Sequence, residues 1–151
     1  MNNCNVTAAY NGLNFIFKDN TLSINGKKVL NGEKIIGVYI FDSCILTLTE
    51  DLDVYNKSPA ESYSENRKGN VFAFDFNGDL LWSVNDLIDN VHFPFTLVYA
   101  VDEEHRKKFS DFGVAFQDDC EYCVCLDHGG DSLIIDLTNG KALAKKHLCW
   151  D

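Results

Sequence analysis

The sequence predicts an all-β fold: an antiparallel meander or β-sandwich built from short hairpins, with at most one or two short helices. Five Asn-Gly pairs punctuate the chain, at residues 11–12, 25–26, 31–32, 77–78 and 139–140, and several of them separate short apolar stretches. Asn-Gly is the strongest short-range signal for a two-residue hairpin, because both residues tolerate the positive φ that a primed turn requires. Aromatic residues make up 13% of the chain, and such rings favour strands.

Six strands are expected before residue 50, paired as three hairpins. The first two hairpins turn at the Asn-Gly pairs 11–12 and 25–26, and the third turns at residues 42–43. In residues 46–49 apolar and polar side chains alternate strictly, as in a strand with one buried face. We expect these strands at residues 4–10, 13–18, 21–24, 27–30, 35–41 and 44–49.

Residues 53–70 break this pattern. The segment is polar, contains Pro59 and Gly69, and is longer than the loops of compact domains usually are. Loops of this length are functional or disordered. Both interpretations stay open from the sequence, and a contact surface would use Tyr55, Tyr63, Arg67 and Lys68.

The second half of the chain predicts further hairpins and the short helices. Residues 71–84 form the clearest hairpin, and residues 83–90 fit one helical turn with Asn85 as its cap. In residues 102–109 acids precede bases, which complements the helix dipole and places Glu–Lys pairs four residues apart. Further strands are expected at residues 93–101, 112–116 and 120–126, with a final hairpin over residues 132–145 and a C-terminus held by residues 148–150.

The length and the charge of the chain limit the classes of function that it can have. A chain of 151 residues is expected to form a single domain over residues 1–151, with a genuine core. Its formal net charge is −10, which disfavours binding to the phosphates of nucleic acids and favours basic partners. The alternative is that the acidity only keeps the chain in solution.

The N-terminal residues point to a cytoplasmic protein. They have neither the basic region nor the apolar region of a signal peptide. No run of about 18 apolar residues is present, so no membrane-spanning segment is expected. The sequence does not indicate an oligomeric state.

The six cysteines are interpreted as free thiols that are buried or half-buried. Cys120 and Cys123 form a C-x-x-C pair, which is a frequent half of a zinc site. Here the segment is predicted to be a strand, which would place these two side chains on opposite faces and Cys123 with Cys125 on one face. A zinc site and a redox pair remain the alternatives.

No motif indicates catalysis or a cofactor. Asp75-x-Asn77-x-Asp79 resembles part of a calcium loop, but Leu80 stands where that loop needs Gly, and a hairpin turn explains the same residues. His128 lies in a Gly-rich turn next to acidic residues without a nucleophile motif, and no phosphate-binding glycine motif occurs. We therefore expect no enzyme, no catalytic residue, no metal and no cofactor; a small-molecule or enzymatic site around His128 is kept as an alternative.

Acidic residues gather at three expected strand ends or turns. If two of these clusters meet at one end of a sheet, they form a negative patch with nearby tyrosines that could cover the basic active site of a nuclease. Scattered solvating charge is the alternative interpretation. The candidate partner-binding residues are Glu50, Asp51, Asp53, Tyr55, Asp102, Glu103, Glu104, Asp118, Asp119, Glu121 and Tyr122.

Two hairpin segments, residues 72–81 and 133–143, share a pattern. Each reads apolar-x-apolar-Asp-apolar, followed by Asn-Gly, a polar residue and Leu. The pattern resembles the outer hairpin of a β-propeller blade of the quinoprotein type. A blade takes roughly 40 residues, so the resemblance implies three or four blades; a curved meander or sandwich with blade-like hairpins is the preferred prediction.

The whole profile resembles that of immunity proteins from bacterial toxin–immunity pairs, including those of contact-dependent growth inhibition. The resemblance lies in the size, the acidity, the all-β body rich in aromatic residues and the lack of a catalytic motif. It implies a protein that binds a basic toxin domain, often a nuclease, and blocks its active site. The alternative is a propeller-like or sandwich interaction module without an inhibitory role, with residues 53–70 as its contact.

Overall fold

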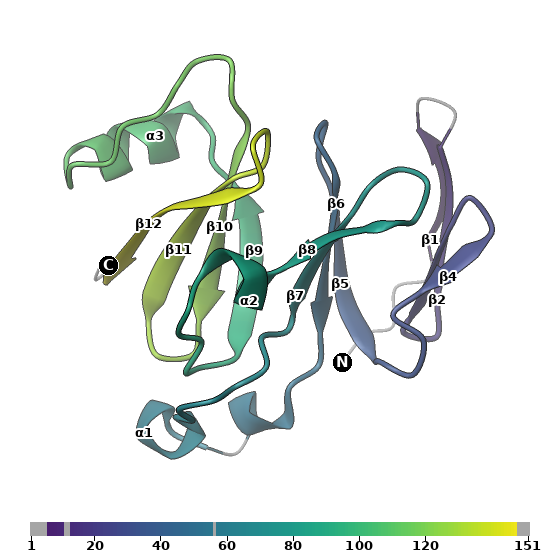
Figure 1. Cartoon of the computed structure of the whole chain (residues 1–151), viewed down its shortest axis with the longest axis horizontal. Helices are drawn as coiled ribbons and strands as arrows, with labels where there is room; N and C mark the ends of the chain where they lie inside the picture. Colours follow the sequence, from purple (N-terminus) through teal and green to yellow (C-terminus); the bar gives the residue numbers. More distant parts are fainter. Residues whose placement is uncertain (1–5, 11–12, 56, 148–151) are drawn as a thin grey trace.

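The structure, a computed structural model, describes residues 6–10, 13–55 and 57–147. It contains three four-stranded antiparallel sheets, in agreement with the predicted all-β class (Figure 1). The first sheet contains β1 (Val6–Tyr10), β2 (Leu13–Lys18), β3 (Thr21–Ile24) and β4 (Lys27–Val29). The second contains β5 (Ile35–Ile40), β6 (Ile45–Thr49), β7 (Val71–Phe74) and β8 (Leu80–Ser83). The third contains β9 (Phe95–Ala100), β10 (Tyr122–Asp127), β11 (Asp131–Asp136) and β12 (Lys141–His147).

Each sheet is a meander in which strands adjacent in space are also consecutive in sequence. All predicted hairpins pair as antiparallel neighbours: β1 with β2, β3 with β4, β5 with β6, β7 with β8, and β11 with β12. Four antiparallel strands per sheet is also the strand number of a propeller blade. The structure thus confirms the antiparallel meander.

The second sheet lies between the other two (Figure 1). One face packs against the first sheet, and that apolar cluster comprises Phe15, Phe17, Leu22, Ile24, Val29, Ile35, Ile45, Phe72 and Phe74. Its other face packs against the third sheet through a larger cluster that includes Leu46, Leu48, Ala73, Trp82, Val98, Cys123, Leu133 and Ile135. The central strands β6 and β7 are therefore buried along their whole length.

Helix α3 (Glu103–Ser110) covers the remaining face of the third sheet. Phe109 of this helix is fully buried with Val124 and Ile134 of the sheet. Asp102 begins the helix by accepting a hydrogen bond from the N–H of His105, with acids in the first turn and lysines in the last, as predicted. The layers thus run from the first sheet through the second and third sheets to α3.

The other helical segments are short. They are a 3₁₀ turn (Leu52–Val54), α1 (Pro59–Ser62) and α2 (Val84–Leu87). The structure therefore has three short α-helices in its described residues, one more than the predicted maximum. Ser83 begins α2, and Asn85, the predicted cap, has a different role that is described below.

Only one described Asn-Gly pair forms the predicted primed turn. Asn25 and Gly26 both have positive φ, 49° and 81°. At the other two hairpin tips only the glycine is left-handed, with φ of 87° at Gly78 and 66° at Gly140. There an Asp side chain at the start of the turn accepts backbone hydrogen bonds, which favours a longer turn with glycine at its end. The pair at residues 11–12 lies outside the described residues.

The strand predicted at residues 112–116 is wrong. This segment continues the end of α3, where the N–H groups of Phe112 and Val114 both donate to the carbonyl of Phe109. Gly113 has φ of 85°, the left-handed conformation that commonly ends a helix. The apolar alternation in this segment thus reflects a helix end. The predicted role of residues 148–150 lies outside the described part of the chain.

Candidate functional site

Two adjoining hollows lie between the ends of the second and third sheets, and Arg106 of α3 contributes to the lining of one of them. The larger has a volume of about 700 Å³ and is lined by Ser43, Leu81, Trp82, Asp86, Leu87, Leu137, Thr138, Asn139 and Gly140. The smaller has a volume of about 500 Å³ and is lined by Asp42, Ser43, Ala100, Val101, Arg106, Asp118, Asp119, Cys120, Glu121, Tyr122 and Thr138. Ser43 and Thr138 belong to both, so we treat the two hollows together as the inter-sheet groove.

Glu121 fixes the middle of the inter-sheet groove. Its carboxylate accepts hydrogen bonds from the N–H groups of Asp42 (3.0 Å) and Ser43 (2.8 Å), which form the β5–β6 turn. Its own N–H donates to the hydroxyl of Thr138 in the β11–β12 turn, at 2.8 Å. One residue at the start of the third sheet thus joins the turns from both sheets that form the groove.

Arg106 of α3 holds the loop that carries Asp118 and Asp119. Its guanidinium donates to the carbonyls of Gln117 (3.0 Å) and Cys120 (2.8 Å), at either side of the two aspartates. The same guanidinium lies 5.1 Å from the ring centroid of Tyr122, a cation–π distance. The cation is therefore engaged within the protein, and the two aspartates are presented on a fixed backbone.

Tyr122, a predicted partner-binding residue, is buried. Its side chain is 3% exposed, and its hydroxyl accepts a hydrogen bond from the N–H of Gln117 at 3.0 Å. Burial is the main cause of the raised pKa of this hydroxyl. Tyr122 supports the loop from below and contributes to the lining of the smaller hollow, although it is almost wholly buried.

The groove combines negative charge with an apolar floor. Its lining carries five carboxylates against a single basic side chain, Arg106. Leu81, half-exposed, lies beside the buried Trp82, whose indole is 3.5 Å from the position a Cβ would take at Gly140. The charge is concentrated in this part of the chain as well, since residues 36–140 hold twenty acidic residues against six basic ones. The acidic lining residues are Asp42, Asp86, Asp118, Asp119 and Glu121.

The acidic start of α3 lies next to this groove, because Val101 in its lining precedes Asp102. The N–H of His105 and its ring Nδ1 lie 2.8 Å and 2.7 Å from the Asp102 carboxylate. These contacts lower the pKa of Asp102. Glu103 and Glu104 are exposed, and Glu104 lies 4.0 Å from Lys108. Two of the three predicted acidic clusters are therefore brought to one end of the molecule.

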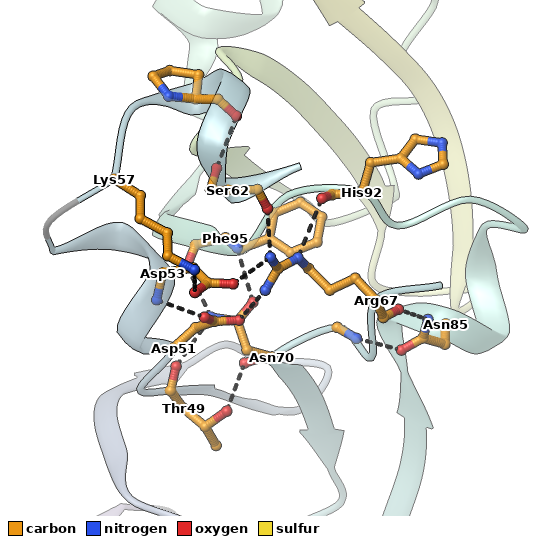
Figure 2. A network of polar contacts seen from close by, with 12 residues as sticks. Thr49, Asp51, Asp53, Lys57, Ser62, Arg67, Asn70, Asn85, His92 and Phe95 are labelled. Carbon is orange, nitrogen blue, oxygen red and sulfur yellow. Dashed lines mark hydrogen bonds and ion pairs between the residues drawn. The ribbon is translucent and has the colours of Figure 1, made fainter. Parts of the chain in front are cut away.

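The third predicted cluster, residues 50–53, lies at the opposite end, near α1 (Figure 1). Figure 2 shows that Asp51 and Asp53 point toward the guanidinium of Arg67, at 2.6 Å and 2.7 Å. Asp53 also pairs with Lys57 at 2.7 Å. The hydrogen bonds from Lys57 and then from Arg67 lower the pKa of Asp53. These carboxylates are neutralised within the molecule.

Glu50 and Tyr55 complete this cluster. The carboxylate of Glu50 lies 3.2 Å from Nζ of Lys34 and accepts a hydrogen bond from the hydroxyl of Tyr55 at 3.1 Å. The pKa of the Tyr55 hydroxyl is raised, with burial as the first cause and the bond to Glu50 as the second. Half of the Tyr55 side chain remains exposed, at a surface apart from the inter-sheet groove.

The long polar loop is ordered around Arg67 and Asn70 (Figure 2). Besides its two carboxylates, Arg67 donates to the carbonyls of Ser62 (2.5 Å) and His92 (3.2 Å). Asn70 donates to the carbonyls of Thr49 (3.0 Å) and Phe95 (2.9 Å) and so joins the second and third sheets. Among residues 53–55 and 57–70, the segment that the sequence left open as functional or disordered is therefore held by a defined network of hydrogen bonds.

Asn85 closes this network from α2. Its side-chain oxygen accepts the N–H of Gly69 at 2.6 Å, and its Nδ2 donates to the carbonyl of Arg67 at 3.2 Å. From the sequence, Arg67 was expected only as part of a contact surface, and Asn70 was not singled out. The sequence did carry one signal: in this polar loop, acidic residues are followed by a basic residue and then by an amide. That order fits a segment paired within the molecule as well as a contact surface.

The four described cysteines are free and buried. Cys44, Cys123 and Cys125 lie between the second and third sheets, whereas Cys120 lies on the side of α3, as the strand prediction required. Burial raises the pKa of the Cys44 thiol to about 12. The bond to Cys125 and burial raise the pKa of Cys123 as well. The thiols of Cys44 and Cys123 are therefore protonated at neutral pH, which makes them poor nucleophiles. Residues 4 and 149 lie outside the described part.

The calcium-like and histidine-containing segments serve as turns. The Asp75 carboxylate accepts the N–H groups of Asn77 and Asp79, both at 2.9 Å. Nε2 of His128 lies 2.9 Å from the carbonyl of Lys57, outside both hollows of the groove. Among the described residues, no three His, Cys, Asp or Glu side chains are grouped so that they could hold a metal ion.

The chain matches no protein-family model. No curated protein matches it significantly. In residues 6–10, 13–55 and 57–147, no helix is long and apolar enough to cross a lipid bilayer.

Proposed function

We propose that this chain is a cytoplasmic binding protein of the immunity type, which captures a basic toxin domain at its inter-sheet groove and covers the active site of that domain. The observation that supports the proposal is the lining of the groove: five carboxylates, one internally engaged cation and an apolar floor. The protein acts by occupying its partner, and we infer binding without turnover.

Charge favours a protein partner over a nucleic acid. Carboxylates in a groove repel phosphates and attract a cationic surface, and complementary charge of this kind raises association rates strongly at low salt. Leu81 and Trp82 beside the carboxylates offer the mixture of apolar anchor and polar surround that interfaces use. A stable interface needs about 800 Å² from each partner, so the surface around the groove has to take part.

A nuclease is the class of toxin that this chemistry fits best. The active site of a nuclease holds phosphates with basic side chains, and carboxylates can occupy the same positions. Asp118 and Asp119 are exposed on a loop that Arg106 fixes, so they are preorganised for such a contact. Preorganisation lowers the entropy lost on binding.

The test is titration of the purified chain against a basic toxin domain encoded next to it, with nuclease activity and heat of binding as readouts. We expect inhibition at one-to-one stoichiometry and an affinity that falls as salt rises. The double variant Asp118→Asn/Asp119→Asn should bind more weakly, whereas Glu33→Gln/Glu65→Gln, which changes the net charge equally on exposed residues outside the groove lining, should not. Equal binding by both double variants would refute the role of the groove; no complex at low salt would refute the function.

The second candidate is an interaction module without inhibitory action, which would use residues 53–70. Its support is a row of exposed apolar side chains at that end: Leu52 is 72% exposed, and Tyr55 and Tyr63 are about half exposed. The Arg67 network holds the backbone that carries them. Binding that is insensitive to salt and lost on Leu52→Ser/Tyr63→Ser would favour this candidate over the immunity function.

A further inference from the structure

The Asn-Gly pairs of this chain differ in how the fold engages them, and that difference has a chemical consequence. Asn-Gly is the dipeptide most prone to spontaneous deamidation, since glycine does not obstruct its own nitrogen, and asparagine is a thermolabile residue for this reason. We propose that Asn31-Gly32 is the site of preferred deamidation among the four Asn-Gly pairs that the structure describes.

The reaction is an internal attack followed by hydrolysis. The backbone nitrogen of Gly32 loses its proton and attacks Cγ of Asn31; a C–N bond forms, the bond from Cγ to Nδ2 breaks, and ammonia leaves. The product is a cyclic succinimide. Water then opens either carbonyl of the ring and gives aspartate or isoaspartate. Water is the sole co-reactant, and nothing is oxidised or reduced.

Three of the described pairs are restrained against this attack. Asn25 uses its whole side chain: its oxygen accepts the N–H of Asn14 at 2.9 Å, and its nitrogen donates to the carbonyl of Phe76 at 2.9 Å. The amide is therefore held away from its own backbone. In the pair Asn77-Gly78, the N–H of Gly78 donates a hydrogen bond to the carbonyl of Asp75 at 3.1 Å. The nitrogen that would attack is therefore engaged in a hydrogen bond.

The pair at residues 139–140 is restrained at both groups. Nδ2 of Asn139 donates to the Asp136 carboxylate at 2.8 Å. The N–H of Gly140 donates to the carbonyl of Asp136 at 2.9 Å. The amide and the attacking nitrogen are thus both fixed by the turn that begins at Asp136.

Asn31-Gly32 has neither restraint. Both residues are exposed, and within the described residues neither the side chain of Asn31 nor the N–H of Gly32 takes part in a hydrogen bond. A Cβ placed on Gly32 would meet nothing within 4 Å, so the space around the attacking nitrogen is open. The pair lies in the link between β4 and β5, where no strand partner constrains it.

The experiment follows each pair in the intact protein by peptide mass spectrometry during incubation at mildly alkaline pH, with a parallel sample unfolded in urea. In the folded protein we expect Asn31 to convert before Asn25, Asn77 and Asn139, with isoaspartate among its products. In urea the four pairs should convert at similar rates, because the fold no longer distinguishes them. Folded-state conversion of any of the other three at the rate of Asn31 would overturn the proposal.

The variant Asn31→Gln gives a second readout. Glutamine keeps the amide on an exposed position but forms the cyclic product much more slowly, so the earliest acidic species on isoelectric focusing should disappear. Persistence of that species in Asn31→Gln, with the mass change mapped to residue 25, 77 or 139, would contradict the proposal. The comparison of folded and unfolded wild-type protein stands whether or not the variant folds.

Discussion

Replacement of Arg67 by Ala is expected to lower the free energy of unfolding by about 3 kcal/mol. The Arg67 side chain is 8% exposed and donates to the carbonyls of Ser62 and His92 and to two carboxylates. A hydrogen bond to a charged group contributes about 1.5–3 kcal/mol, and removing one partner of a buried ion pair costs about 3–5 kcal/mol. The lower end of this range applies because the carboxylates are partly exposed. The ion pair between Arg67 and Asp53 is not counted in the expected loss, because Asp53 keeps its ion pair with Lys57 when Arg67 is replaced.

The assay is urea and thermal unfolding followed by circular dichroism and tryptophan fluorescence. A loss of this size in a domain of 151 residues should lower Tm by roughly 6–12 °C. Arg67→Lys should lose most of the same stability, because an ammonium cannot bridge acceptors spread over four groups. Lys57→Ala is the matched control, since its single ion pair is half-exposed and such pairs contribute little.

The position of the effect can be tested too. Arg67→Ala should raise amide hydrogen exchange in residues 51–69 before it affects β10 or β11, since the network holds the loop and the sheet core is separate. If Arg67→Ala and Lys57→Ala shift the urea midpoint equally, or if exchange rises evenly over the chain, Arg67 is not the centre of this loop and the reasoning is refuted.

Three further predictions concern the groove end of the molecule. Glu121→Ala removes the acceptor for two N–H groups of the β5–β6 turn and should cost about 1–3 kcal/mol in urea titration; an unchanged midpoint would show that the turn stands without it. Because burial raises the pKa of Cys44 to about 12, this thiol should resist iodoacetamide at about pH 8 in the folded protein and react on unfolding; site-resolved mass spectrometry that finds equal labelling in both states would contradict this. The contacts from His105 lower the pKa of Asp102, so its contribution to stability is present at neutral pH and is lost as pH falls through the lowered value; the acid limb of the stability curve should flatten in Asp102→Ala, and a curve parallel to wild type would count against it.

The strand pattern could be predicted from sequence because its signals are local. Apolar alternation and Asn-Gly pairs act over a few residues, and they predicted all five hairpins that the structure contains at those positions. The geometry of the turns could be predicted less well from the sequence. The left-handed glycines at 78 and 140 were foreseen, and Asp75 was assigned to a hairpin turn in preference to a calcium loop. The hydrogen bond that Asp136, the last residue of β11, accepts from the next turn was not foreseen.

Whether an acidic cluster is paired within the molecule or exposed on its surface depends on residues distant in sequence, so it could not be predicted. Asp51 and Asp53 are neutralised by Arg67, which follows them by many residues and returns to them only through the path of the loop. Asp118 and Asp119 remain exposed, since Arg106, the basic residue of the groove lining, is turned toward carbonyls and rings. Both clusters are acidic in the sequence. Only the path of the chain in the fold decides whether their carboxylates form internal ion pairs or a charged surface.

The purely sequential strand order affects how this protein reaches its native state. Each strand pairs with one that precedes or follows it in the chain, so the four strands of a sheet come from one continuous segment of the sequence. This continuity allows each group of four strands to form while the ribosome is still adding the next. The middle group, apolar on both sides, would remain aggregation-prone until residues 95–136 are synthesised, so translation pauses before that point are the moment of greatest risk.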